Sequence, residues 1–374
     1  MVGHRFYFLA LVGLVGWLCF QPCSVPARET DNFYLPLDID LADVGDFLEA
    51  VHTCVLEEVV KELNSRIERV LRLADPRERA SRLDRLHDTA TLADALIARF
   101  GYFLVEDTRL ERALRGSWAR KTYPARKTSH GDIWMNLSAH LPLDPRQFAV
   151  LQQSHTVRAC GVYFGTDKMV HFHHLGISYY MMYRRLLERG LSTGEALRSV
   201  IEHNTRHGFF AETGLFGSLI TGIYSNGDLA ANLAGFKFYL NLTEEVILKG
   251  KPCAPLIVRN STFWRLNQHV RPGSGWFCAF ISDHWNEALN PSLYEASMRP
   301  GIRRVLTSRA AHIVQFYTEK DGRPNDPTYF DNLARELSTY YGEPYGHSGQ
   351  FDKLMTIGNT CIRALQEKAA NDRN

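Results

Sequence analysis

Apolar residues recur at helical spacing along much of this chain, and this period restricts the fold more than any other feature. In Leu41–Leu73, apolar residues repeat every four positions with charged residues between them. Pro76 interrupts the pattern, which then continues to Phe100, and Gly101 suits a helix end. Few segments alternate apolar and polar residues as strands do. The sequence therefore predicts a mainly α protein, a single large helical globular domain in which the N-terminal helices are either integrated or form a subdomain.

The first residues predict export. A short polar start is followed by the apolar run Phe6–Phe20, and Val25 and Ala27 are small residues suited to a signal peptidase. The apolar run is shorter than the roughly 20 residues that cross a bilayer. We therefore expect residues 1–27 to be a signal peptide. The alternative is an uncleaved anchor.

The chain after this segment is predicted to be periplasmic or secreted, without a stable membrane span, because no later segment is apolar for long enough. We divide it into an N-terminal helical region and loop, residues 28–145, and a helical core domain, residues 146–374, that carries the candidate site. Lys and Arg number 43 against 41 Asp and Glu, which argues against nucleic acid as a partner. A small molecule, a lipid or a cell-envelope substrate remains open.

Five cysteines follow the predicted signal peptide: Cys54, Cys160, Cys253, Cys278 and Cys361. An odd number cannot all pair within the chain. Their wide spacing, without a CxxC motif, does not suit a structural zinc site. An exported protein can hold one or two disulfides, and we predict that Cys253 pairs with Cys278.

A polar face on a predicted helix is the first group of residues that suits chemistry. Thr166 can cap a helix that runs to about Arg189. On that helix Asp167, His171 and His174 share one face among apolar neighbours. An Asp beside a His can orient the imidazole for proton transfer, or the pair can ligate a metal. The alternative is a buried Asp–His hydrogen bond that only stabilises the core.

The next predicted helix carries a second group. Ser192 and Glu195 form a capping box at its start. His203 and His207 lie four positions apart, a spacing that lets two imidazoles bind one metal ion, although surface histidines often show it. Glu212 follows among aromatic residues and glycines. It can be an acid or base with a raised pKa, or a helix cap or loop salt bridge.

A third helix is predicted after Ser225 or Asn226, either of which can cap it. Asp228, Asn232 and Gly235 share one of its faces, and its small residues allow another helix to approach closely. We therefore predict that this Asp–Asn face packs against the Asp–His face of the first helix. The alternative role of Asp228 is a favourable charge in the first turn of the helix.

A fourth polar group, residues 282–287, can be an extra wall of a site or a helix start that ends at Asn290-Pro291. We prefer the second interpretation. The sequence contains no GxSxG elbow, phosphate-binding loop or dinucleotide-binding motif.

The run Asp167–Phe172 reads DKxxHF and resembles the DKxxHF element of VanZ-like envelope proteins. It also resembles uncharacterised exported bacterial proteins in which a GTDKxxHF segment precedes a motif like Ser225–Gly235. The resemblance covers about residues 160–242 and implies no particular activity. VanZ-like proteins are embedded in the membrane, and this chain departs from them there.

Together these patterns predict an exported envelope protein that is a metal-assisted hydrolase. The predicted catalytic residues are Asp167, His171, Glu212 and Asp228. The predicted metal ligands are His171, His174, His203 and His207. Zinc or another divalent ion held there would lower the pKa of bound water. One alternative is a non-catalytic binding or assembly protein whose Asp–His–Asn network is structural. Another is a lipid-binding protein with an apolar cavity near residues 209–239.

Overall fold

The computed structural model describes residues 41–100, 126–127, 155–207, 212–213 and 222–373. The predicted signal peptide, residues 1–27, and the predicted boundary between residues 145 and 146 lie outside these ranges. Within them, no helix combines the length and the apolar composition that crossing a membrane would require.

The described chain begins with three helices, α2 (Gly45–Leu71), α3 (Pro76–Leu86) and α4 (Thr89–Phe100). Of the predicted apolar stripe of α2, Val59 and Leu63 are fully buried, whereas Val51 and Val55 are half-buried. The side chain of Asp75 accepts a hydrogen bond from the Arg77 amide at 2.8 Å and so caps α3. This cap restarts the helix after the predicted break.

A hairpin leads into the helices that carry the first two candidate groups. Its strands are β2 (His155–Ala159) and β3 (Val162–Gly165), with β1 (Arg126–Lys127) added beside β2. The helices are α8 (Asp167–Val170), η4 (His171–Leu175), α9 (Gly176–Glu188), α10 (Thr193–Glu202) and η5 (His203–His207). The predicted capping box of Ser192 and Glu195 is confirmed at the start of α10. Both η4 and η5 are π-helical, a conformation that occurs frequently at functional sites.

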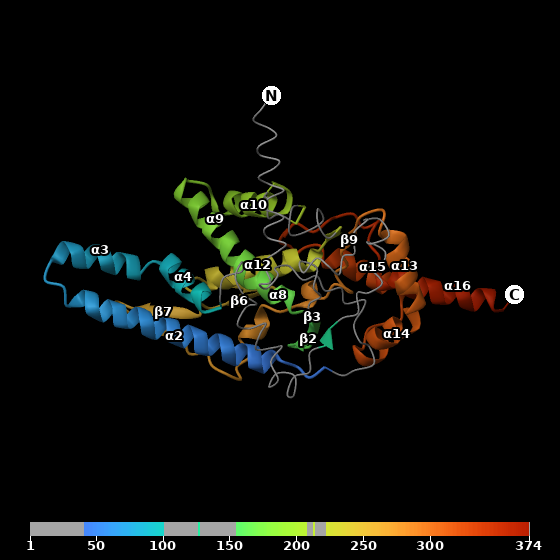
Figure 1. Ribbon diagram of the computed structural model, residues 1–374, viewed down its shortest axis with the longest axis horizontal. Coiled ribbons are helices and arrows are strands. Elements are labelled where there is room, and N and C mark those ends of the chain that lie inside the picture. The colour runs from blue at the N-terminus through green and yellow to red at the C-terminus, as the bar shows by residue number, and fades with distance from the viewer. Residues whose placement is uncertain (1–40, 101–125, 128–154, 208–211, 214–221, 374) are drawn as a thin grey trace, which may run out of the picture.

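Helix α12 (Asn226–Asn241) lies near the centre of the molecule and is buried along almost its whole length (Figure 1). Ser225 caps it by accepting a hydrogen bond from the Asp228 amide at 3.1 Å. The helix packs on α9 and η4. A Cβ added at Gly176 or Gly235 would overlap the backbone of the opposite helix. The predicted close helix pair is therefore confirmed.

The prediction of a single large helical domain is wrong. The described residues also form four small antiparallel sheets, and their apolar core divides into two clusters. Most of the strands were missed because they are too short to show a clear alternation. Two hairpins turn on residue pairs with positive φ, Cys160-Gly161 and Lys249-Gly250, which suits a type I′ turn.

Three further strand pairs connect the helices. They are β4 (Ile223–Tyr224) with β9 (Leu293–Tyr294), β5 (Val246–Leu248) with β6 (Lys251–Cys253), and β7 (Ile257–Asn260) with β8 (Phe263–Leu266). The register of the first pair sets Tyr224 opposite Leu293. This pairing brings the start of α12 beside the chain that follows residue 287.

The second apolar cluster lies among the C-terminal helices, at the end of the molecule opposite to α3 (Figure 1). These helices are α13 (Arg299–Ser308), α14 (Ala310–Gln315), η8 (Phe316–Lys320), α15 (Pro327–Glu336), η9 (Ile357–Ile362) and α16 (Arg363–Asn371). Two short 3-10 turns, η6 (Phe277–Ala279) and η7 (Asp283–Trp285), precede them.

Cys160 and Cys278 form a disulfide with their Cα atoms 5.5 Å apart, so the prediction that Cys278 pairs with Cys253 is wrong. Cys160 lies in the turn between β2 and β3, and the fold brings this turn beside η6. Cys253 is a free thiol, as are Cys54 and Cys361. The bridge joins residues 118 positions apart, so sequence spacing favoured a nearer but incorrect partner.

Candidate active site

A buried ammonium group is the centre of the candidate site. The Nζ atom of Lys168 lies 2.8 Å from Asp167 Oδ2, 2.5 Å from Asp228 Oδ1 and 2.7 Å from Glu287 Oε1. The Lys168 side chain is 0% exposed and the three carboxylates are at most 3% exposed. The positive charge of Lys168 therefore joins three parts of the chain: the first turn of α8, the first turn of α12 and the segment after η7.

His171 extends this cluster by one helical turn. Its Nε2 atom lies 3.3 Å from Asp228 Oδ2, and its Nδ1 atom lies 3.0 Å from Asn232 Oδ1. Asn232 Nδ2 also donates to the Tyr179 hydroxyl at 3.4 Å. Asp228 thus bridges Lys168 and His171. The predicted meeting of the Asp–His face with the Asp–Asn face is confirmed.

Ser225 connects two more acidic side chains to the cluster. Its hydroxyl donates to Glu287 Oε1 at 2.8 Å, and its backbone amide donates to Glu212 Oε1 at 2.7 Å. The same hydroxyl accepts the capping hydrogen bond from the Asp228 amide. Ser225, which caps α12, therefore also fixes the position of Glu212. The Glu212 side chain is 4% exposed.

Burial and neighbouring charges separate the pKa values of these acids. Burial raises the pKa of Glu212 well above its usual range, and the negative charge of Asp228 adds to this. Burial also raises the pKa of Asp167, although Lys168 opposes the shift. Burial would raise the pKa of Asp228 too, but the positive charges of His171 and Lys168 outweigh it and lower that pKa. A protonated acid beside an ionised one is an arrangement that acid–base enzymes use.

The predicted metal ligands are only partly assembled in the described residues. Both ring nitrogens of His171 contact Asp228 or Asn232. Burial lowers the pKa of His174 to about 4, and His171 adds to that shift. His203 is exposed, whereas the side chain of His207 lies outside the described residues. No group of three or more His, Cys, Asp or Glu side chains in the described ranges is arranged to hold a metal. The metal ligands stay a prediction.

Sequence reasoning missed Lys168 and Glu287. The DKxxHF run contains Lys168, but the sequence predicts no function for it. For Glu287 the sequence predicts only a place in a helix start. The useful sign was a lysine inside a strongly apolar stretch, because a buried lysine needs acidic partners. Nothing near Glu287 in the sequence indicates that it faces position 168.

A second histidine pair lies on the apolar side of η4 and was also missed. The Nε2 atoms of His52 and His173 lie 3.0 Å apart, and His52 Nδ1 donates to the Leu48 carbonyl at 2.6 Å. Phe277 stacks on His52 and Phe100 stacks on His173. Burial lowers the pKa of His52 to about 3, so the ring is neutral near pH 7. This pair fills the core between α2 and η4.

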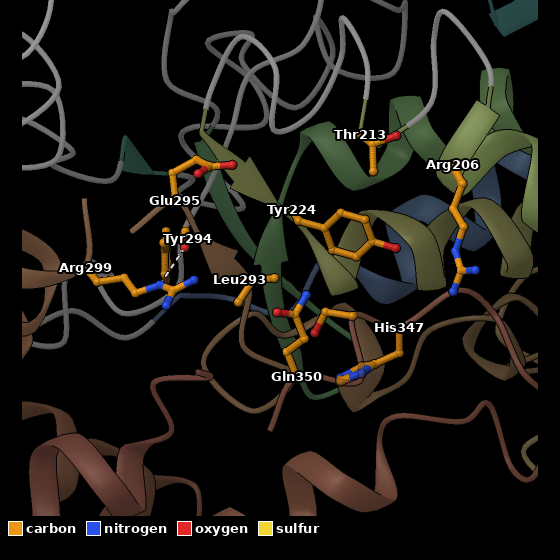
Figure 2. Close-up of a pocket in the computed structure, with 10 residues that line it drawn as sticks. Arg206, Thr213, Tyr224, Leu293, Tyr294, Glu295, Arg299, His347 and Gln350 are labelled. Carbon is orange, nitrogen blue, oxygen red and sulfur yellow. Dashed lines mark hydrogen bonds between the residues drawn. The ribbon is translucent and has the colours of Figure 1, made fainter. Parts of the chain in front are cut away.

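A cavity of about 380 Å³ is lined in part by residues that neighbour the acidic cluster along the chain. Thr213 and Tyr224 line it, and each is joined by a peptide bond to a cluster residue, Glu212 or Ser225. In the view of Figure 2, Arg206, Tyr224 and His347 gather at one end of the cavity, and Glu295 and Arg299 at the other. The cluster and the cavity therefore share two chain segments.

His347 lines this cavity, and the hydrogen bonding of its ring fixes the tautomer. Its Nδ1 atom accepts a hydrogen bond from the Gly349 amide at 3.0 Å, so a neutral ring carries its proton on Nε2. Nε2 is buried and has no hydrogen-bond partner among the described residues. Burial lowers the pKa of His347 to about 4, which keeps the ring neutral near pH 7.

No family model, curated protein or solved structure matches this chain. The resemblance to VanZ-like proteins therefore stays a prediction.

Proposed function

We propose that this protein is an exported hydrolase that uses the cluster around Lys168 for acid–base chemistry on a substrate bound in the adjacent cavity. One observation carries the proposal. The peptide bonds Glu212-Thr213 and Tyr224-Ser225 each join a residue of the buried cluster to a residue of the cavity wall. Two residues of the cluster are thus next in the chain to residues that line the space a substrate would occupy.

The cluster supplies the two proton transfers that hydrolysis needs. Glu212, whose raised pKa favours its protonated form, is the candidate general acid that gives a proton to the leaving group. Asp228, whose lowered pKa keeps it ionised, is the candidate base for the proton of the attacking water. Lys168 and His171 are positioning residues, because their contacts with Asp228 hold it ionised. Asp167 balances the charge of Lys168.

The disulfide between Cys160 and Cys278 supports the exported location, since such bridges persist mainly in oxidising compartments. The predicted signal peptide points the same way. Periplasmic or secreted localisation is therefore part of the proposal.

The test compares the wild-type chain with Glu212→Gln on chromogenic carboxylic esters, phosphate esters and amides. Glutamine keeps the oxygen that accepts from the Ser225 amide and resembles a protonated glutamate, so the variant should keep its stability. We expect turnover to fall by roughly 10²- to 10⁴-fold, the usual contribution of a general acid. Glu343→Gln, at the separate ion pair with Lys237, is the matched control and should keep full activity.

The proposal fails if no substrate class is turned over by the wild-type chain, or if Glu212→Gln is as active as wild type. A thermal unfolding curve for each variant separates lost chemistry from lost folding.

A second candidate is a non-catalytic binding or assembly protein whose polar network only fixes the helix packing. The observation that favours it is burial, because Lys168 is 0% and Asp228 is 1% exposed. On this view Asp228→Asn would lower stability and no substrate class would be turned over. The same panel of substrates and unfolding curves therefore decides between the two functions.

A further inference from the structure

A second hollow, independent of the proposed catalytic cluster, lies between the N-terminal helices. Helix α2 supplies Arg66 and Arg69 to it, and α3 supplies Arg82 and Arg85. Its volume is about 570 Å³. Figure 1 shows α2 and α3 side by side at the end of the molecule away from α16, so this arginine groove is remote from the helix pair that carries Lys168.

The charge of the arginine groove is poorly balanced. None of the described residues that line it is acidic. Arg82 pairs with Glu78 at 2.6 Å and Arg66 lies 3.9 Å from Glu62, but these pairs are largely exposed and each is of the i,i+4 kind. Such exposed pairs contribute little and are easily exchanged for another partner. Arg69 and Arg85 have no ion pair within the described parts of the chain.

The floor of the groove is apolar. Val70, Leu73 and Leu86 line it, and Val70 and Leu86 are almost fully buried. Thr91, at the start of α4, adds a hydroxyl whose hydrogen bond to the Arg85 carbonyl holds α3 and α4 together. The groove therefore combines positive charge at its rim with a surface that suits carbon atoms.

We propose that this arginine groove binds a phosphate group carried on an organic molecule. Guanidinium groups bind phosphate through paired hydrogen bonds, and four of them around one groove focus a positive potential that attracts a multiply charged anion. The repulsion among the four arginines favours a phosphate over a singly charged carboxylate. The apolar floor contacts the carbon part of the ligand.

Two sources share this chemistry, the headgroup of an anionic phospholipid and a soluble phosphate ester. The test therefore has two arms with the full chain. Calorimetric titration with inorganic phosphate measures the soluble anion. Co-sedimentation with phosphatidylglycerol vesicles, against phosphatidylcholine vesicles, measures the lipid surface. Both are repeated with Arg69→Gln/Arg85→Gln, which removes the two arginines that form no ion pair with the described residues and leaves the helix faces otherwise intact.

The matched control is Arg303→Gln/Arg304→Gln, which removes the same charge from two exposed arginines of α13. We expect the groove variant to weaken binding by on the order of tenfold or more, and the control to bind as wild type. Binding of both probes, or of vesicles alone, identifies a lipid headgroup. Binding of inorganic phosphate alone identifies a soluble ester. Binding of neither probe overturns the proposal, and so does an equal loss in both variants, which would reflect net charge alone.

Discussion

The Cα atom of Gly235 on α12 packs directly against the carbonyl group of Phe172 on η4, with no room for a side chain between them. Gly176 makes the reciprocal contact with the backbone at Gly235. This close crossing is what allows Asp228 and His171, on the two helices, to reach each other. The geometry of the candidate site thus depends on glycines that carry no chemistry.

Gly235→Ala should therefore be strongly destabilising. The new methyl group would overlap the Phe172 carbonyl, and the backbone must shift to relieve it. We expect a loss of about 3 kcal/mol in the free energy of unfolding, measured by urea denaturation. Gly194→Ala is the control, because a Cβ there meets no atom within 4 Å and alanine favours the helix. Equal stabilities for the two variants would contradict this account.

Lys168→Met should destabilise the protein more than Lys237→Met does. The first change leaves three buried carboxylates without their shared positive charge, a loss of roughly 3–5 kcal/mol. Lys237 is nearly as buried, but its partner Glu343 is 36% exposed and can be solvated by water. Chemical denaturation of both variants at neutral pH makes the comparison. A larger loss of stability in Lys237→Met than in Lys168→Met would show that the three carboxylates do not need the positive charge of Lys168.

The disulfide between Cys160 and Cys278 predicts a specific thiol pattern. Peptide mapping after alkylation without reduction should find these two cysteines joined, and Cys54 and Cys253 alkylated. Removing the bridge with Cys160→Ala should cost about 2–5 kcal/mol of stability, whereas Cys253→Ala should change it little. A peptide that joins Cys253 to Cys278 would disprove this connectivity.

Stability should fall as the pH falls below about 6.5. Burial lowers the pKa of His52 to about 3 and that of His174 to about 4 in the folded protein. Between those values and 6.5 the unfolded chain binds protons that the folded protein does not, so acid favours unfolding. For His52 the effect is up to roughly 1.4 kcal/mol for each pH unit.

His52→Phe isolates this contribution because phenylalanine fits the surrounding aromatic rings. Urea denaturation at pH 7 and at about pH 4.5 should show a smaller loss of stability in the variant than in wild type. Buried Glu212 and Asp167 have raised pKa values and act in the opposite direction, but they are common to both proteins. An identical pH dependence would mean that His52 is not the titrating group.

The zinc hypothesis has its own measurement. We expect elemental mass spectrometry of the purified protein to find no stoichiometric metal. The reason is that His171 uses both ring nitrogens within the cluster, and Lys168 already lies among the carboxylates. His171→Ala/His174→Ala is the comparison. Stoichiometric zinc that disappears in this variant while it stays folded would instead establish the metal-assisted mechanism.

The amino-acid sequence by itself determined the features that depend on neighbours along the chain. Apolar residues four positions apart set the buried face of α2, and Ser192 and Ser225 cap the helices that follow them. Helical periodicity also placed Asp167 with His171, and Asp228 with Asn232, on single faces. These inferences hold because a helix repeats every 3.6 residues, whatever surrounds it.

Only the tertiary structure decided which of these faces and loops converge. Lys168 and Glu287 are 119 positions apart, and Cys160 and Cys278 are 118 apart. Their contacts arise from the crossing at Gly235 and from short strand pairs such as β4 with β9. Local periodicity carries no information about such contacts, because the long chain between the partners can close in many ways. The charge balance that sets the protonation of Glu212 was therefore invisible until the chain was folded.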